Sequence, residues 1–267
     1  MVKFTIITIC LNAGNDLIET VERSLKQTYE NLEIIVKDGM STDGCVSRLP
    51  DDPRIKLVRK KDSGIYDAMN QALDYITGDY VIFMNSGDKF YSENTLSIIA
   101  ENIEKNGNML YYGKCYNRKM NHVNAYPREI TEFTCFRNMI CHQSTVYAAE
   151  IFKEKRYDVS YPIFGDRELL LYLFCEKKLK PTYIDEIIVD YKAGGESENK
   201  KHKKRNAADQ KRLNKQYFPL RKRVIYQIMH SVTLPKRRTL IANNPKYSTA
   251  YYNFIRLIYK TVGKKSE

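Results

Sequence analysis

Four short polar segments of this chain, each following an apolar stretch, hold residues that could do chemistry together. They carry carboxylates, amides and hydroxyls, which can hydrogen-bond a base and ribose and hold a divalent cation against a diphosphate. The segments contribute Thr8 and Asn12; Asp38, Gly39, Ser41 and Asp43; Lys60, Lys61, Asp62 and Gly64; and Asn85, Ser86, Gly87 and Asp88. If the fold brings them to one place, the pattern indicates an enzyme that handles a nucleotide-activated substrate.

Each segment taken alone also has an ordinary structural explanation. Asn12 and Asp43 could cap helices, and Asp38-Gly39 could form a simple turn. The coincidence of all four segments is harder to explain in that way. No GxGxxG follows the first apolar stretch and no GxxxxGK[ST] occurs in the sequence, so a dehydrogenase or a P-loop NTPase is not expected.

A repeated strand–helix pattern must position these segments. Apolar strands are expected over residues 3–11, 32–37, 55–59 and 80–84, and the helices between and after them are expected over 16–27, 65–76 and about 96–103. Short apolar strands that alternate with helices predict a parallel, doubly wound α/β sheet. Ligands bind such a sheet beyond the carboxyl ends of its strands, where all four polar segments would lie.

The second half of the chain has a looser pattern, which predicts a mixed-sheet half. The expected elements are strands over 109–115, 122–125 and 182–191, a helix over 167–177, a linker over 194–200, and helices near 203–217, 221–232 and 248–262. We therefore divide the chain into a catalytic domain, residues 1–195, with halves 1–108 and 109–195, and a mostly helical extension, residues 196–267.

The extension is strongly basic. Residues 200–267 hold 19 Lys and Arg against two acidic residues, whereas the whole chain has a formal net charge of +12, so residues 1–199 are mildly acidic. Basic clusters that flank apolar residues at helical spacing favour a surface of anionic lipids. The alternative is that these helices pack on the domain and expose their charges to solvent. Nucleic acid is not an expected partner, because no recognisable nucleic-acid module accompanies the charge.

Composition sets further bounds. Six cysteines without a CxxC pair are typical of reduced thiols in a cytosolic protein. The apolar N-terminus is about one strand long, so we expect a core strand there and not a leader. No run approaches the roughly 20 apolar residues needed to cross a bilayer.

The polar segments also carry a family resemblance. FTIITICLNAG, VKDGMSTDG, DSGIYDAMNQAL and GDYVIFMNSGD together resemble the family 2 glycosyltransferases with the GT-A fold. The subgroup they resemble most is that of bacterial exopolysaccharide enzymes of the colanic-acid type. The match covers about residues 3–190, and its motifs are specific in combination and weak singly. It implies a Rossmann-like, mixed and mostly parallel sheet flanked by helices.

The resemblance implies a role for each polar segment. Thr8 and Asn12 would line the nucleotide pocket, Asp38 would read the edge of the nucleobase, typically uracil, and Gly39, Ser41 and Asp43 would complete that loop. Asp62 and Gly64 would lie near the base and ribose. Asn85-Ser86-Gly87-Asp88 occupies the place of the family's DxD segment, but Asn85 and Gly87 stand where aspartates are common. Asp88 is then the metal contact, for Mn²⁺ or Mg²⁺, and a cation held by one carboxylate leans on the substrate phosphates and water.

A second acidic segment supplies the expected catalytic base. An inverting transfer needs a carboxylate that takes the proton of the acceptor hydroxyl. Phe164-Gly165-Asp166-Arg167-Glu168 precedes an apolar helix, and Asp166 matches the base of the family. The alternative is that Asp166 is a helix N-cap with Glu168 in the first turn.

Cys141-His142-Gln143-Ser144 interrupts an apolar stretch and resembles the subgroup's HQ segment. His142 and Gln143 would then lie near the donor phosphates or the acceptor. The alternative is a hydrogen-bonded core histidine. A zinc pair of Cys141 and His142 is not expected, because no second pair at ligand spacing exists.

The expected activity is transfer of a sugar from a nucleotide-diphosphate sugar, with a UDP-sugar as the expected donor, to a saccharide hydroxyl with inversion. The resemblance implies undecaprenyl-linked acceptors, which would place the protein in the cytoplasm, peripherally at the inner face of the plasma membrane. Two other classes stay open: a sugar nucleotidyltransferase, and a non-catalytic subunit that binds nucleotide-sugar. The sequence does not identify the sugar, the acceptor, the linkage or the oligomeric state.

Overall fold

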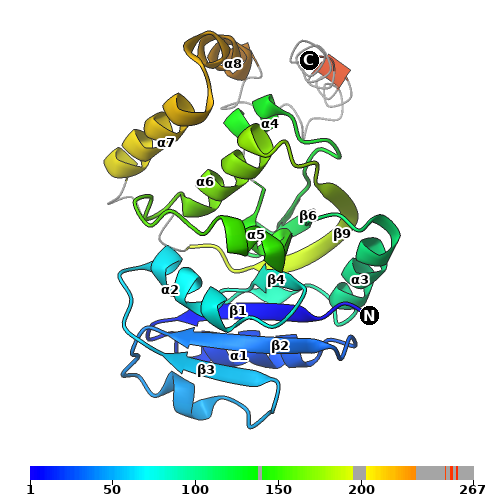
Figure 1. The fold of residues 1–267 in the computed structure, drawn as a ribbon, viewed down its shortest axis with the longest axis vertical. Coiled ribbons are helices and arrows are strands. Elements are labelled where there is room, and N and C mark those ends of the chain that lie inside the picture. The colour runs from blue at the N-terminus through cyan, green and yellow to red at the C-terminus, as the bar shows by residue number, and fades with distance from the viewer. Residues whose placement is uncertain (138–139, 195–202, 233–249, 251–252, 255–256, 258–267) are drawn as a thin grey trace.

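The computed structural model describes residues 1–137, 140–194, 203–232, 250, 253–254 and 257 (Figure 1). Within these residues, nine strands form one sheet in the order β3-β2-β1-β4-β8-β6-β9-β5, with β7 paired to β6. The strands are β1 (Phe4–Cys10), β2 (Leu32–Asp38), β3 (Ile55–Arg59), β4 (Tyr80–Phe83), β5 (Lys89–Phe90), β6 (Leu110–Asn117), β7 (His122–Asn124), β8 (Thr145–Ala148) and β9 (Thr182–Tyr191). The helices are α1 (Asn15–Leu25), α2 (Ile65–Ala72), α3 (Thr95–Asn106), α4 (Glu132–Arg137), α5 (Ala149–Glu154), α6 (Gly165–Leu171), α7 (Lys203–Tyr217) and α8 (Leu220–Val232).

The direction of the strands divides the sheet into two parts. β1 pairs in parallel with β2 and β4, and β2 pairs in parallel with β3. β8 is antiparallel to both β4 and β6, whereas β6 and β9 are parallel and β5 is antiparallel to β9. The mixed α/β sheet with flanking helices is therefore confirmed, and its all-parallel part, β3-β2-β1-β4, comes from the first half of the chain.

Alternating side chains of the central strands bury both faces of the sheet, as expected for strands covered by helices on two sides. On one face, Ile6, Val36 and Ile82 pack with residues of α1 and α3. On the other face, Ile7 and Phe83 pack with residues of α2, α5 and α6. This two-sided burial explains why β1 is mostly apolar and why three apolar residues, 34–36, follow one another in β2.

Several elements differ in detail from the prediction. The helix expected over 65–76 ends as α2 at Ala72 and continues as a 3₁₀ turn, Leu73–Tyr75. The helix expected over 167–177 begins at Gly165 and ends in a π-helical turn, Tyr172–Glu176. The sequence did not predict β5, β8, α4 and α5, because these elements have only two to six residues and too few positions to show a period.

The predicted helices near 203–217 and 221–232 correspond to α7 and α8, which lie beside α4 and α6 at the end of the molecule away from β3 (Figure 1). A third apolar cluster joins them to the body, and it includes Phe133, Phe136, Leu213, Phe218 and Tyr226. Helices α7 and α8 therefore pack on the body of the protein. The helix expected over 248–262 and the boundary at 195/196 lie almost wholly outside the described residues.

Among the described residues, no helix combines the length and the hydropathy that crossing a bilayer requires. All six cysteines are free thiols, as their spacing predicts.

Candidate active site

The loops after β1 and β2 are hydrogen-bonded to each other. The Asn12 amide N donates to Ser41 Oγ at 2.8 Å, and Asn12 Oδ1 accepts from the Thr42 amide at 2.9 Å. Asp43 Oδ2 accepts from the Gly14 amide at 2.8 Å, while its Oδ1 accepts from the Cys45 amide at 3.0 Å. Asn12 has a φ of 51°, a conformation that asparagine tolerates, and it caps no helix here. Two of the predicted segments are thus joined.

Asp38 lies at the end of β2 and is fully buried. Its carboxylate accepts from the Ser41 amide at 2.9 and 3.2 Å and from Arg59 Nε at 3.0 Å. Burial by itself raises the pKa of Asp38, but the hydrogen bonds from Ser41 and Arg59 outweigh it and hold the pKa below its usual value. Asp38 is therefore a fixed anion with its oxygens oriented by its own loop.

A buried ion pair ties the loop after β3 to β2. Lys37 Nζ lies 2.6 Å from Asp62 Oδ2 and donates to the Lys60 carbonyl at 2.7 Å, and the Lys37 side chain is fully buried. Asp62 Oδ1 accepts from the Gly64 amide at 3.2 Å. A Cβ on Gly39 would stand 2.9 Å from Asp62 Oδ2, so glycine is needed for this close approach.

The Asn85–Asp88 turn after β4 is tied to β1 and α1. Ser86 Oγ donates to the Ile9 carbonyl at 2.9 Å, and the Gly87 amide donates to Thr20 Oγ1 at 2.9 Å. Gly87 has a φ of 98°, which favours glycine at this position. The four predicted segments therefore meet at the carboxyl edge of the parallel strands.

Asp88 is almost completely buried, and both of its carboxylate oxygens accept hydrogen bonds. Oδ2 accepts from Gln143 Nε2 and Oδ1 from the Lys192 amide, each at 2.9 Å. Burial raises the pKa of Asp88 to about 6, against the opposing effect of these hydrogen bonds. The negative charge of Asp88 is therefore costly in the free protein, and a nearby cation would stabilise it.

The side chains of this turn offer few ligands to a metal ion. Asn85 Oδ1 is buried and accepts no hydrogen bond from the described residues, so one oxygen acceptor is available in the same turn as Asp88. Over the residues that the structure describes, no group of three or more His, Cys, Asp or Glu side chains could hold a metal ion. These residues fit a hard cation that takes most of its ligands from substrate phosphates and water.

Asp166 lies in the first turn of α6, which begins at Gly165. Its Oδ1 accepts from Tyr66 Oη at 2.9 Å and from the Arg167 amide at 2.7 Å, whereas no described residue donates to Oδ2. A Cβ on Gly165 would stand 2.7 Å from the Tyr66 ring, so glycine lets α6 approach α2 this closely. The residue at the N-cap position is Phe164, so Asp166 does not occupy it.

His142 and Gln143 lie between Asp88 and Asp166. Gln143 contacts Asp88, and the buried His142 ring stacks on Phe83 with 4.9 Å between ring centroids. Burial lowers the pKa of His142, although the charge of Asp166 opposes the shift, so the imidazole is neutral at pH 7. His142 is not the hydrogen-bonded core histidine of the alternative, because neither ring nitrogen has a partner among the described residues.

Other buried polar atoms near these residues lack partners in the described part of the chain. They are Tyr147 Oη and Tyr157 Oη, and the His142 ring lies 6.2 and 5.8 Å from the Tyr147 and Tyr157 rings. Buried polar groups are normally hydrogen-bonded, so this cluster is a place where water or a ligand would be stabilised.

Sequence reasoning missed four residues that hold the site together. Lys37 and Arg59 fix Asp62 and Asp38, Tyr66 orients Asp166, and Lys192 donates to Asp88. Lys37 alone left a signal, as a charged residue that directly follows the apolar run 34–36 of β2. The other contacts cross 21 to 104 residues of sequence, and spacing within one segment does not reveal them.

The chain matches the family described as "Glycosyl transferase family 2" over residues 5–167. A "PGL/p-HBAD biosynthesis glycosyltransferase" of Mycobacterium bovis (strain BCG / Pasteur 1173P2) is 28% identical over 199 residues, which are 72% of this chain and 77% of that protein. "Glycosyltransferase GlyG" of Streptococcus pneumoniae is 30% identical over 120 residues, which are 43% of this chain and 40% of that protein.

Solved structures with the same fold include two in complex with UDP or GDP-Man. S. aureus TarS 1–349 in complex with UDP has a TM-score of 0.60 at 18% identity, covering 72% of this chain and 60% of that chain. The mannosyltransferase PcManGT from Pyrobaculum calidifontis, in complex with GDP-Man and Mn²⁺, has a TM-score of 0.58 at 16% identity, covering 73% and 58%. At these identities the likeness shows the fold, which is of the GT-A type expected from the sequence. Because the family match spans more than half of the chain, this protein belongs to glycosyl transferase family 2.

Proposed function

We propose that this glycosyltransferase moves a sugar from a UDP-sugar to a hydroxyl of a saccharide or lipid-linked saccharide, with inversion, in bacterial polysaccharide biosynthesis. The observation that carries the proposal is the contrast between two carboxylates, Asp88 after β4 and Asp166 in the first turn of α6. Both oxygens of Asp88 accept a hydrogen bond, from Gln143 and the Lys192 amide, whereas no described residue donates to Asp166 Oδ2. The two environments suit two different roles.

The donor nucleotide is proposed to bind over the loops after β1, β2 and β3. Asp38 is the acceptor for the N–H of uracil, and Thr8, Asn12, Gly39, Ser41 and Asp43 shape the surrounding loop. Asp62 and Gly64 lie beside the ribose. The ionised state of Asp38 supports this assignment, because its lowered pKa keeps it an acceptor at neutral pH.

Asp166 is proposed as the base that takes the proton of the acceptor hydroxyl. Its Oδ1 is held by Tyr66, so Oδ2 can accept that proton as the hydroxyl oxygen attacks the anomeric carbon and the nucleotide diphosphate leaves. Asn85, Ser86 and Gly87 face the diphosphate, with His142 and Gln143 nearby. A Mn²⁺ or Mg²⁺ held by Asp88 and Asn85 Oδ1 would supply Lewis-acid stabilisation of the leaving diphosphate.

The acceptor is proposed to be undecaprenyl-linked, and the protein to act in the cytoplasm at the inner face of the plasma membrane. The basic extension supports this placement, since each Lys or Arg near an anionic surface is worth about 1 kcal/mol.

Donor class is tested by the thermal stability of the purified protein with UDP, GDP, CDP or dTDP, each with Mn²⁺ or with EDTA. A ligand at 100 times its Kd adds about 2.7 kcal/mol of stability. We expect a metal-dependent rise with UDP alone. A rise in thermal stability that persists in EDTA would show that donor binding does not need the metal. No rise with any nucleotide would favour the non-catalytic alternative.

The base is tested by Asp166→Asn, which keeps the shape of the side chain and removes its basicity. We expect the transfer rate to fall on the order of 10²–10⁴-fold while UDP binding is unchanged. Glu150→Gln on the exposed surface of α5 removes the same charge and is the matched control. Transfer near the wild-type rate would overturn the base, and release of pyrophosphate from a nucleoside triphosphate plus sugar phosphate would reveal a nucleotidyltransferase instead.

A further inference from the structure

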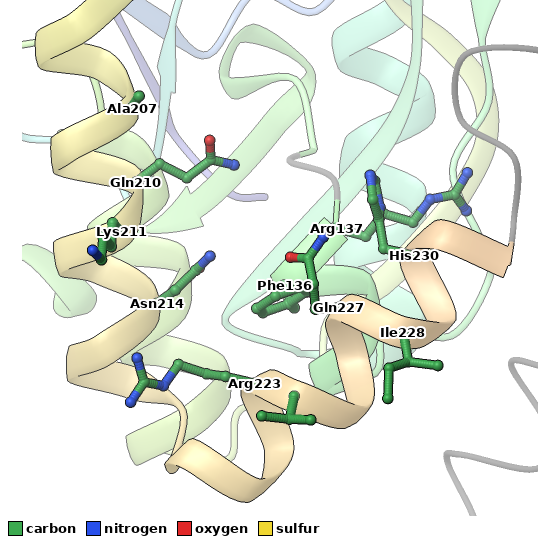
Figure 2. A pocket seen from close by; sticks show the side chains of 11 residues that line it. Phe136, Arg137, Ala207, Gln210, Lys211, Asn214, Arg223, Gln227, Ile228 and His230 are labelled. Carbon is green, nitrogen blue, oxygen red and sulfur yellow. The ribbon is translucent and has the colours of Figure 1, made fainter.

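A cavity of about 640 Å³ lies between α4, α7 and α8, and none of the residues proposed for sugar transfer lines it (Figure 2). Its walls come from Phe136 and Arg137 of α4, from one face of α7, and from the α8 residues between Arg223 and His230. The proposed sugar transfer gives this cavity no role.

The cavity is lined by positive charge. Arg137, Lys211 and Arg223 line it together with His230, and no acidic side chain of the described residues does. Burial and the charge of Arg137 both lower the pKa of His230, as expected in a positive field. Arg223 Nε is buried and makes no hydrogen bond with the residues that the structure describes. Such a lining favours an anion, because guanidinium groups donate forked hydrogen bonds to phosphate oxygens.

Neutral donors complete the lining, and a buried arginine holds one of them, Asn214, in place. Figure 2 shows the amides of Gln210, Asn214 and Gln227 reaching into the space between α7 and α8. Asn214 Oδ1 accepts from the Arg167 guanidinium at 3.2 Å. Arg167 is 97% buried and also donates to the carbonyls of Cys135 and Phe136, so its position is fixed. With its oxygen held, Asn214 has its N–H₂ group left to donate to a ligand.

An exposed apolar stripe borders the cavity. Leu220, Val224 and Ile228 follow one another at four-residue spacing along α8 and are 68%, 51% and 60% exposed. Val224 and Ile228 also line the cavity. Large apolar side chains beside a cluster of cations match a ligand that has an anionic group and a hydrocarbon part.

We propose that this cavity binds the phosphate group of an anionic membrane phospholipid, with the apolar stripe of α8 in the acyl boundary. The inference rests on the membrane association proposed above and gives it a specific site. Charge complementarity disfavours the rest of the chain as the occupant, because residues 233–267 hold eight Lys and Arg against one acidic residue. The apolar stripe disfavours nucleic acid, whose backbone offers charge without hydrocarbon.

The test is binding of the full chain to vesicles of phosphatidylcholine with 30% phosphatidylglycerol, measured by sedimentation. We compare Lys211→Gln/Arg223→Gln, which alters the cavity, with Lys215→Gln/Arg221→Gln, which removes the same charge from exposed positions of α7 and α8 outside it. The cavity pair is expected to weaken binding at least tenfold more than the control pair. Thermal unfolding of each variant checks that it is folded.

Three outcomes would overturn the proposal. Equal losses for the two pairs would mean that the tail binds by general charge attraction. Equal binding of the wild type to pure phosphatidylcholine would show that binding does not need an anionic headgroup. If inorganic phosphate binds with the same dependence on Lys211 and Arg223 while vesicles do not, the cavity serves a soluble anion. UDP binding is measured on the same samples, so a failure of the donor proposal is distinguished from a failure here.

Discussion

Asp88 and Asp166 show how the surroundings of a side chain decide what one functional group can do. Asp88 is buried with both oxygens occupied, and burial raises its pKa to about 6. Asp166 is half-buried with one oxygen held by Tyr66. A base needs an accessible lone pair, whereas a buried anion gains most from a cation, so the two residues are not interchangeable.

The raised pKa of Asp88 predicts a pH-dependent cost to stability. The folded protein binds the Asp88 proton more tightly than the unfolded chain does, so the protonated carboxyl contributes to the free energy of unfolding. This stabilising contribution is fully present below about pH 4 and is lost as the pH rises through about 6. A shift of about two units corresponds to about 3 kcal/mol. Asp88→Asn lacks this loss, so its stability relative to wild type should rise by up to that amount between pH 4 and 7.

Urea unfolding of both proteins across this pH range, without metal or nucleotide, measures the difference. A difference that stays constant with pH would show that the buried carboxylate carries no such cost.

Tyr66 is a positioning residue for Asp166, and its hydroxyl can be removed without losing its ring. Burial and the charge of Asp166 raise the pKa of Tyr66 well above its usual range, so it stays a donor. A hydrogen bond to a charged group is worth about 1.5–3 kcal/mol, and Tyr66→Phe should therefore lower kcat roughly tenfold or more. Because the Tyr66 hydroxyl bonds to Asp166 and to the Ile163 carbonyl, which are not part of the proposed donor loops, the KM for the donor should change little.

Steady-state kinetics separate these two effects, with Tyr75→Phe at a partly exposed position as the control. A rise in KM at constant kcat would mean that Tyr66 acts on binding and does not orient the base.

At the scale of elements, the ion pair between Lys37 and Asp62 joins β2 to the loop that leads into α2. Lys37→Met leaves Asp62 without its partner at a site where the Asp62 side chain is only 13% exposed. Breaking a buried pair costs about 3–5 kcal/mol. UDP affinity should fall as well, because the same loop is proposed to hold the nucleoside.

The double variant Lys37→Met/Asp62→Asn is the control, since it removes both charges. Urea unfolding should show that it regains more than half of the stability lost in Lys37→Met. A double variant as unstable as the single one would place the effect in packing and not in the unpaired charge.

The sequence predicted the elements that repeat and the residues that follow them. Alternating apolar strands and helices predicted β1 to β4, and the strand ends identified Asp38, Asp62 and Asp88 as neighbours. The period could not predict β8, a four-residue antiparallel strand, or its insertion between β4 and β6. Nor could it predict the partners of Asp88, because Gln143 and Lys192 lie 55 and 104 residues away along the chain.

For the whole molecule, α7 and α8 share a core with the body of the protein. Phe218 is 1% exposed, and its ring packs on Phe136 and Tyr226 with centroids 5.6 and 5.8 Å apart. Phe218→Ala should cost about 3–5 kcal/mol of stability. Leu220→Ala, two residues further on and 68% exposed, should cost less than about 0.5 kcal/mol.

Urea unfolding of the two variants measures this contrast. Equal and small losses would mean that α7 and α8 form a separate extension that the catalytic domain does not need.

The bond between Asp88 and the Lys192 amide also has a consequence for the order in which the protein is made. Domains fold from the N-terminus as synthesis proceeds. A nascent chain that has just passed Asp88 already contains the sequences of strands β1 to β4, but Gln143 and Lys192, which donate to Asp88, are still to be translated. Asp88 therefore lacks both donors until residue 192 emerges from the ribosome, so the site can close only about a hundred residues after its first half has been translated.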